Sequence, residues 1–153
     1  MADESLRLDA FIPFRLSYTS NLVSDRIART YEALFGLTIP EWRLVAVIAE
    51  GGGITQAAIG QRTRMDKVTV SRAAIALSAR GLLAREGNPD DRRSHLLTLT
   101  AAGRDLYAAV APKALELERR IFAELPREEV EAFVATLRRI DEAALGLDGA
   151  LDG

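Results

Sequence analysis

The fold is decided by residues 55–99, which read TQAAIGQRTRMDKVTVSRAAIALSARGLLAREGNPDDRRSHLLTL. Thr55 is a suitable N-cap for a short helix that runs to about Gln61, because its hydroxyl can accept a hydrogen bond from a first-turn amide. Asp66 is a suitable N-cap for a second helix, which stops at Gly81 because glycine readily adopts the left-handed backbone that ends helices. This stretch therefore predicts two helices on either side of a tight turn.

The second of these helices has two different faces. Its apolar residues recur at helical spacing and are expected to face inward: Val70, Ala74 and Leu77. The residues expected to face outward are Thr69, Arg72 and Ala76. Because the outward face carries a cation and a hydroxyl group, it is more than a solvating surface.

A β-hairpin is expected directly after the second helix. Residues 82–86 and 95–99 have the composition of two short strands. The residues between them, 87–93, are rich in Gly, Asn, Pro and Asp, which is typical of an exposed loop. This loop is a candidate wing.

Two helices are expected upstream of this stretch. Pro13 suits the first turn of the first helix, where its missing N–H donor is harmless, and Gly36 ends that helix. Thr38 and Glu41 have the spacing of a capping box, which opens the second helix, and the glycines at 51–53 stop it. The core candidates on this helix are Trp42, Val45 and Ile48.

Two further helices are expected downstream. Thr100 caps the first, and Pro126 opens the second. In the last helix the apolar residues repeat at intervals of three and four: Val130, Phe133, Leu137, Ile140 and Ala144. This is the seam of a helix that packs lengthwise on another helix. The partner helix belongs either to a second chain or to this one, because any helical core shows the same spacing.

The composition excludes several kinds of site. The 153 residues are 48% hydrophobic and 27% charged, as in an ordinary globular domain. With no cysteine and one histidine, the chain has no thiol switch and no zinc site of Cys and His ligands. A hydrolase or transferase with paired Asp or Glu residues is the weaker alternative, because no two acids are spaced to converge in a pocket. We therefore expect no enzyme, no catalytic residue, no metal and no cofactor.

The charges are unevenly distributed along the chain. Between Arg62 and Arg104 there are nine Lys or Arg against four Asp or Glu, whereas the remainder has eleven against eighteen. Such a basic region favours a polyanionic partner, although charges that only solvate surface helices give the same count. No apolar run approaches the ~20 residues that span a bilayer, and the first ten residues lack a signal-peptide pattern. We expect a cytoplasmic protein with no membrane partner.

Five short pieces of the sequence belong together. They are Leu37-Thr38 with Trp42-Arg43, then 66–72, 80–85, Asp91-Arg92-Arg93 and 99–103. In this order and spacing, they closely resemble the MarR family of bacterial transcription regulators, over nearly the whole chain. The resemblance implies a mainly α fold with a small β-hairpin wing. It divides the single chain, 1–153, into a winged helix-turn-helix at 38–100 and flanking N- and C-terminal dimerisation helices at 5–36 and 101–146.

The helix that begins after Asp66 is the candidate for reading DNA bases. Residues at the N-terminal end of a helix reach base edges in the major groove, and its amides attract phosphate. The candidate contacts on this helix are Lys67, Val68, Thr69, Ser71 and Arg72. Arg72 is the best base reader, and the methyl groups of Val68 suit a thymine. In the alternatives, Arg72 pairs with an acid one turn away and Ser71 packs inside the turn.

Other candidate contacts precede this helix. The resemblance implies that Thr55 and Gln56 touch the DNA backbone, although an N-cap role explains Thr55 equally well. Arg62 and Arg64 fit phosphate contacts in the turn.

Asp91-Arg92-Arg93 matches the Asp-x-Arg wing motif of the family. The resemblance implies that Arg93 enters the minor groove while Asp91 holds it. A narrow A·T-rich minor groove concentrates negative potential, and a guanidinium that is already oriented loses less rotamer freedom there. The alternative is a solvated turn of mixed charge.

The resemblance also implies an organic effector. Oxidation sensors of the family use Cys, and its zinc sensors need several His or acidic ligands, so an aromatic carboxylate, a related phenolic compound or a thioester remains. Its expected place is the junction of the first, second and fifth helices. The residues that offer ring surface and cations there are Phe14, Arg15, Tyr18, Trp42 and Arg43. Core packing explains Phe14 and Trp42 at least as well.

Three positions leave alternatives open. Gly60 replaces the usual Ala of the family, so its helix is either looser or packed close to another backbone. Ile75 falls where many relatives are polar, and it either packs under the wing or faces DNA. His95 is more typical of a surface residue than of a ligand or a pH sensor.

The sequence thus favours a ligand-responsive repressor that binds a pseudo-palindromic double-stranded operator as a homodimer. The alternative is a winged-helix protein-interaction module without specific DNA binding. The cations at Arg72 and Arg93 argue against that alternative.

Overall fold

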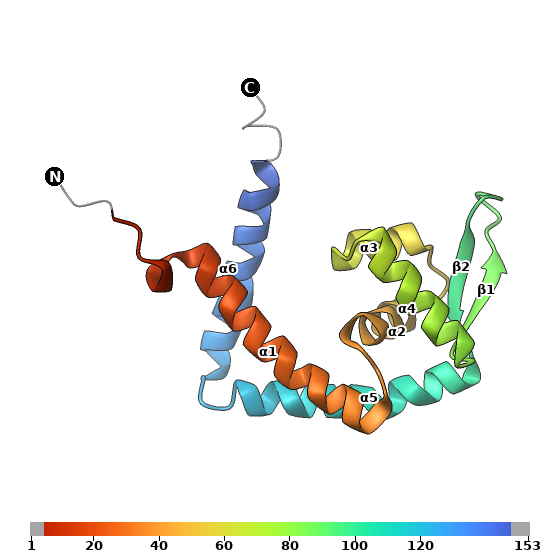
Figure 1. Ribbon diagram of the computed structural model, residues 1–153, viewed down its shortest axis with the longest axis horizontal. Helices are drawn as coiled ribbons and strands as arrows, with labels where there is room; N and C mark the ends of the chain where they lie inside the picture. Colours follow the sequence, from red (N-terminus) through yellow and green to blue (C-terminus); the bar gives the residue numbers. More distant parts are fainter. Residues whose placement is uncertain (1–4, 148–153) are drawn as a thin grey trace. The chain divides into compact units, whose positions relative to one another are not determined.

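The computed structural model describes residues 5–147, and within them it contains six α-helices, a short 3-10 helix and one two-stranded antiparallel hairpin (Figure 1). The elements are, in chain order, η1 (Leu8–Ala10), α1 (Ile12–Phe35), α2 (Ile39–Gly51), α3 (Gln56–Thr63), α4 (Lys67–Ala79), β1 (Leu83–Gly87), β2 (His95–Leu99), α5 (Ala101–Ile121) and α6 (Arg127–Gly146). The prediction of a mainly α fold with a β-hairpin is confirmed.

The first two helices begin and end at the predicted signals. Pro13 lies in the first turn of α1, and Gly36 follows the helix with left-handed backbone at φ 61°. The capping box is complete, because the Thr38 N–H donates to Glu41 at 2.9 Å and the Glu41 N–H donates to the Thr38 hydroxyl at 3.3 Å. α2 continues to Gly51, at the glycine run that the sequence marks as its end.

Three element boundaries differ slightly from the predicted ones, and one of them is the end of β1, which lies at Gly87 and not at residue 86. α3 extends past Gln61 to Thr63, whose hydroxyl donates to the Ile59 carbonyl at 2.7 Å and so adds to the last turn. β1 begins at Leu83, because the Leu82 N–H donates to the Leu77 carbonyl at 3.0 Å and closes the end of α4. The differences at the end of α3 and at the start of β1 arise from hydrogen bonds at a helix end.

The hairpin is tied to the helices at its base. β1 and β2 pair in register from Leu83 with Leu99 to Gly87 with His95. Ile54, in the loop before α3, forms a bridge with Leu97 through N–H to carbonyl bonds of 3.2 Å and 2.8 Å in the two directions. The hairpin is therefore anchored to the start of α3.

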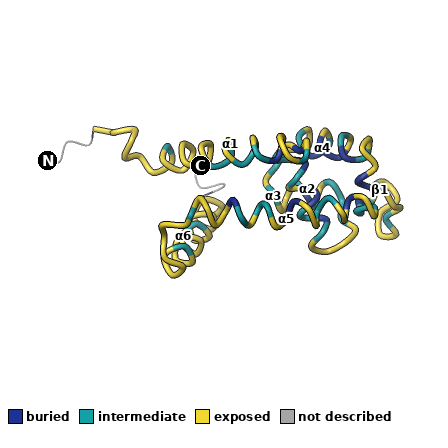
Figure 2. The backbone as a smooth tube through the Cα atoms, turned by 90° about the horizontal axis from the view of Figure 1, so that it is seen from below, coloured by how far each residue is buried: buried dark blue, intermediate teal, exposed yellow. Residues whose placement is uncertain are grey.

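The core that positions α4 lies between α2, α3, α4 and the base of the hairpin, where the buried backbone is concentrated in Figure 2. Its fully buried side chains are Leu44, Val45, Ile48, Ile59, Val70, Ala74, Leu77 and Leu97. The inward face predicted for α4 and the core positions Val45 and Ile48 are confirmed, whereas Trp42 is half-buried. Because one face of α4 is held this tightly, its opposite face has a fixed orientation.

The chain divides into two compact units with a boundary between Leu115 and Glu116, inside α5. The first unit contains α1 to β2 and most of α5, and the second contains the end of α5 and α6. No residue of α6 is buried, and the seam residues Phe133 and Ile140 are 44% and 37% exposed. The apolar seam of α6 is thus largely uncovered in the described part of a single chain.

Candidate nucleic-acid interface

The N-terminus of α4 is capped as predicted. The Asp66 carboxylate accepts a hydrogen bond from the Thr69 N–H at 2.7 Å. Hydrogen bonds from Thr69 hold the pKa of Asp66 below its usual value, and the nearby charge of Arg72 adds to this effect. Asp66 therefore remains an anionic cap that orients the first turn of the helix.

The outward face of α4 presents cations and apolar groups together. Lys67, Val68 and Arg72 are exposed, and Thr69 and Ser71 are half-buried. Within residues 5–147 no salt bridge occupies Arg72, so its guanidinium is available.

Ile75 lies on the same outward side of α4. Its side chain is 59% exposed, so the alternative that it packs under the wing is wrong.

The helix before α4 is held by its own cap and by a close approach to the turn. The Thr55 hydroxyl accepts from the Ala58 N–H at 3.2 Å, which confirms it as an N-cap. At Gly60, a Cβ atom would lie 3.2 Å from the Met65 carbonyl oxygen. Gly60 thus belongs to the close-packed alternative, since an alanine would press on the turn between α3 and α4.

The two arginines of this region differ in their surroundings. Arg62 donates to the carboxylate of Glu50 at the end of α2, and both side chains are about half exposed. Arg64 ends α3 with left-handed backbone at φ 54°, and it is the one such residue other than glycine among the described residues. A non-glycine residue in this conformation pays a conformational cost, which favours a role for its side chain.

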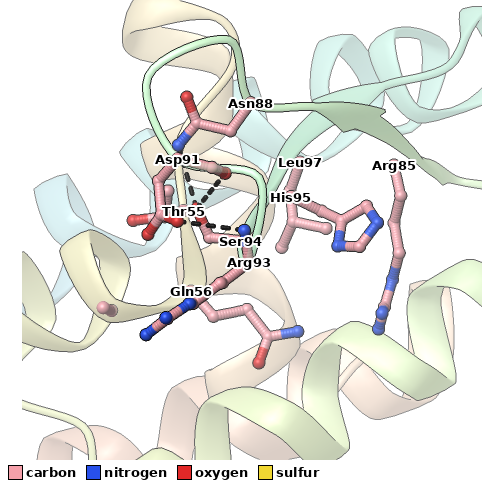
Figure 3. A pocket seen from close by; sticks show the side chains of 10 residues that line it. Thr55, Gln56, Arg85, Asn88, Asp91, Arg93, Ser94, His95 and Leu97 are labelled. Atoms are coloured by element: carbon pink, nitrogen blue, oxygen red, sulfur yellow. Dashed lines mark hydrogen bonds between the residues drawn. The ribbon is translucent and has the colours of Figure 1, made fainter.

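The wing loop is ordered by hydrogen bonds within itself (Figure 3). Asn88 donates to the Ser94 hydroxyl at 2.9 Å, and the Ser94 N–H donates to the Asp91 carbonyl at 3.2 Å. The Asp91 carboxylate accepts from the backbone N–H of Arg93 at 2.9 Å. Asp91 thus holds Arg93 through its backbone, and no salt bridge to the Arg93 guanidinium forms within residues 5–147. Arg92 and Arg93 are both exposed.

A pocket of about 400 Å³ lies between the N-terminus of α3 and the wing. Figure 3 shows Gln56 and Arg93 on one side of it, and His95 and Arg85 on the other. Arginine side chains beside the first amides of a helix suit the binding of a phosphate group. His95 is exposed there, as expected of a surface residue.

The residues expected at an effector pocket form two groups. Phe14 and Tyr18 pair on α1 with ring centroids 5.9 Å apart, and the Arg15 guanidinium carbon lies 5.2 Å from the Tyr18 centroid. Arg15 and Tyr18 are exposed.

Trp42 belongs to a different aromatic cluster. It stacks on Tyr107 of α5 with centroids 5.8 Å apart and planes at 15°, and it meets Tyr31 of α1 edge-on at 5.9 Å. Burial raises the pKa of the Tyr31 hydroxyl. Tyr31 follows Tyr18 by thirteen residues, which is about 20 Å along a helix. The structure therefore does not bring Trp42 and its exposed neighbour Arg43 together with the Tyr18 group in one chain.

Two kinds of site are missing from the part of the chain that the structure describes. None of its helices combines the length and apolar character that crossing a membrane requires. No three of its His, Asp or Glu side chains gather where they could hold a metal ion.

Comparison with known proteins places this geometry in a family. A model of the MarR family matches residues 35–94, which include α2, α3, α4, β1 and most of the wing. The transcriptional regulator HosA of Escherichia coli O111:H- is 30% identical over 91% of this chain and 99% of its own length. The chain belongs to the MarR family.

Solved structures agree with the MarR assignment. A MarR/EmrR family regulator from Acinetobacter sp. ADP1 superposes with a TM-score of 0.84 at 22% identity, over 91% of this chain and 98% of that one. The DNA binding of BpsR from Bordetella bronchiseptica is regulated by 6-hydroxynicotinic acid. BpsR superposes with a TM-score of 0.82 at 26% identity, over 90% of this chain and 97% of the BpsR chain. The MarR relatives are transcriptional regulators and not enzymes, and this chain is accordingly a transcriptional regulator with a winged helix fold.

In this MarR-family chain, two structurally important contacts gave no signal in the sequence. The Arg80 guanidinium donates to the carbonyls of Gly36 and Phe35 at 3.2 Å and 3.1 Å, so it caps the C-terminus of α1 from the end of α4. Glu50 neutralises Arg62 from a neighbouring helix. Both contacts join residues far apart in sequence, so periodicity and capping patterns do not reveal them.

Proposed function

We propose that this MarR-family regulator is a repressor that acts in the cytoplasm, binds a specific operator as a homodimer, and responds to a small organic effector. The observation that carries the proposal is the outward face of α4. The helix is fixed by its buried face, and it presents Arg72, whose guanidinium no salt bridge engages among the described residues. A side chain held in this way can donate two hydrogen bonds to a guanine edge in the major groove.

The proposed DNA contacts fall into three groups, which lie on α4, around the turn before it and in the wing. On α4, the proposed base and phosphate contacts are Lys67, Val68, Thr69, Ser71 and Arg72. Around the turn, the proposed backbone contacts are Thr55, Gln56, Arg62 and Arg64. In the wing, Arg92 and Arg93 approach the minor groove while Asp91 fixes the loop. Side chains on base edges carry sequence information, whereas phosphate contacts fix register.

The proposal of a homodimer rests on apolar surface outside the winged helix. Large exposed apolar side chains occur along η1 and α1 and along α6, among them Phe11, Leu16, Phe133 and Ile140. Surface of this kind marks an interaction site on a folded protein. Equilibrium sedimentation at micromolar concentration should show a dimer, and a stable monomer would contradict this part of the proposal.

The proposal of an aromatic effector, whether an acid, a phenolic compound or a thioester, is supported by the aromatic cluster of Trp42, Tyr31 and Tyr107. A pocket of about 370 Å³ is lined by Tyr107 and Arg104, among other residues. The Arg104 guanidinium can pair with a carboxylate. BpsR supplies one probe, 6-hydroxynicotinic acid.

Trp42 is the single tryptophan of the chain, so its fluorescence reports on this cluster directly. Titration with 6-hydroxynicotinic acid and with other aromatic carboxylates should change the Trp42 emission and lower DNA affinity over the same concentration range. If DNA affinity changes while Trp42 emission stays constant, the effector binds elsewhere. Substitutions in the α1 group would then test it, at Phe14, Arg15 and Tyr18.

The experiment that tests DNA recognition is selection of bound duplexes from a random pool, followed by footprinting. A symmetric dimer should select a pseudo-palindrome with half-site centres about 10 base pairs, one helical turn, apart. Protection of a single half-site at saturating protein would contradict symmetric docking. Binding that falls steeply with salt but selects no sequence would favour the protein-interaction module instead.

A further inference from the structure

The winged-helix region carries an apolar pair that its core does not use. Between residues 38 and 100, all of which the structure describes, two large apolar side chains are exposed, Val68 at 58% and Ile75 at 59%. The other large exposed apolar residues of the described chain lie in residues 6–34 and 115–147. The pair is therefore separate from the surfaces assigned above to dimerisation.

Val68, Arg72 and Ile75 lie on one face of α4. Their spacing of four and then three residues places them within about 60° of one another around the helix axis. The face that includes Val70, Ala74 and Leu77 lies on the other side and is fully buried. Along the helix axis, Arg72 thus lies between two aliphatic side chains on the surface that faces away from the core.

The chemistry of this face matches the major groove of DNA. Lys67 and Arg72 are the exposed cations of α4, and the carboxylate at its start, Asp66, is engaged as a cap. Base edges in the major groove offer hydrogen-bond acceptors together with one apolar group, the 5-methyl of thymine. A guanine flanked by thymines offers acceptors to the central cation and methyl groups to the aliphatic side chains on either side of it.

We propose that Val68 and Ile75 recognise the methyl groups of two thymines that flank the base contacted by Arg72. This inference rests on the proposed function of DNA recognition and adds its sequence preference. The two residues are separated by seven positions, about 10 Å along the helix, and base steps are about 3.4 Å apart, so the thymines lie at most about three base pairs apart in each half-site. Ile75 is thus a specificity-determining residue that the sequence alone left undecided.

The size of the effect follows from the apolar surface involved. Covering one methyl group removes about as much apolar surface from water as burying one methylene, which corresponds to about threefold to fivefold in affinity. Replacing thymine by uracil deletes only this methyl group and leaves base pairing and the other groove atoms in place. The protein counterpart is Ile75→Ala, which removes the aliphatic group at an exposed position where packing of the core is unaffected.

The test combines both changes on the duplex selected by the wild-type protein. Replacing either flanking thymine by uracil should weaken wild-type binding about threefold to fivefold per half-site. The Ile75→Ala protein should lose sensitivity to uracil at one of these positions and the Val68→Ala protein at the other. Arg72→Ala serves as the matched control, because it should bind more weakly but keep its sensitivity to uracil at both positions.

Three outcomes overturn the inference, and they are distinguishable. If wild-type protein binds its selected duplex with equal affinity after every uracil substitution, DNA recognition stands and the methyl contacts are wrong. If Ile75→Ala and Val68→Ala keep the full uracil effect, other residues read the methyl groups. If no duplex is selected at all, the proposed function fails together with the inference.

Discussion

The Asp91 carboxylate accepts a hydrogen bond from the backbone N–H of Arg93 at 2.9 Å, and within residues 5–147 no salt bridge engages the Arg93 guanidinium. Asp91 therefore fixes the backbone conformation of the wing loop and does not hold the Arg93 side chain. Asn88 and Ser94 complete the same loop through their own bond of 2.9 Å. The loop presents Arg93 in a fixed place without neutralising it, which suits a side chain that must enter a negatively charged groove.

Substitutions at Asp91 should separate geometry from charge. Asp91→Asn keeps an oxygen that can accept from the Arg93 N–H, so DNA affinity should stay within about twofold of wild type. Asp91→Ala removes the acceptor, and affinity should fall about twofold to tenfold, the range of one lost hydrogen bond. Fluorescence anisotropy with the selected duplex measures both. Equal losses in the two variants would show that the negative charge matters instead.

Glu50 should reduce the availability of Arg62 for DNA. Their salt bridge must open before Arg62 can contact a phosphate, and an exposed pair of this kind is weak. Glu50→Gln should therefore raise DNA affinity about twofold to fivefold at low salt, and high salt should remove the gain. The matched control is Arg62→Ala, in which Glu50→Gln should have no further effect. Lower affinity in Glu50→Gln would instead mean that Glu50 orients Arg62 for its phosphate contact.

Gly103 should not tolerate a side chain. A Cβ atom at Gly103 would lie 2.2 Å from the Leu82 carbonyl oxygen, which also accepts the Thr100 N–H at 3.1 Å. Gly103→Ala must move either α5 or the start of β1, and the free energy of unfolding should fall by about 1 to 3 kcal/mol. Urea denaturation measures it. Gly51→Ala is the control, because a Cβ there meets nothing within 4 Å, and equal stabilities for the two variants would contradict the packing at Gly103.

Asp66 should make stability depend on pH in the acidic range. Its pKa is held below the ordinary 3.8, chiefly by the hydrogen bond from the Thr69 N–H, so the folded protein binds this proton less readily than the unfolded chain does. The stabilisation is therefore fully present above pH 3.8 and is lost as the pH falls through the lowered pKa.

Asp66→Asn provides the comparison, because asparagine can cap the helix but does not titrate. The stability difference between wild type and Asp66→Asn should be constant at neutral pH and should shift against the wild type as the pH falls below 4. Parallel curves for the two proteins down to pH 2.5 would show that the cap does not depend on the charge of Asp66.

Much of the fold follows from local signals. The capping box of Thr38 and Glu41 and the caps at Thr55 and Asp66 depend on atoms within three residues, so sequence spacing predicts them correctly. Contacts between distant residues have no such signature. The bridge of Ile54 to Leu97 and the Arg80 cap on α1 become visible only when the elements are placed in space.

The local features of the candidate site could likewise be predicted from the sequence, whereas its contacts between distant residues could not. The outward face of α4 follows from helical periodicity, because the core fixes the opposite face. One chain does not bring Trp42 together with Tyr18, because α1 is a single helix of 24 residues, about 36 Å long, and the two rings lie near different parts of it. Whether Ile75 faced the wing or the solvent depended on the position of the hairpin, which no local pattern determines.

The central claim, that α4 reads bases while the wing reads the minor groove, is tested most directly by measuring DNA affinity over a salt series. The proteins are wild type, Arg72→Ala and Arg93→Ala, and the duplexes carry the selected site with A·T-rich or G·C-rich flanks. Arg72→Ala should lose about 1 to 3 kcal/mol of binding free energy and relax the preference at one base pair of each half-site, with either flank. Arg93→Ala should lose most affinity on the A·T-rich flank, and its salt dependence should be shallower by about one counterion per wing. If Arg93→Ala binds both flanks with wild-type affinity and salt slope, and Arg72→Ala keeps the full base preference, the assignment of α4 and the wing to DNA is contradicted.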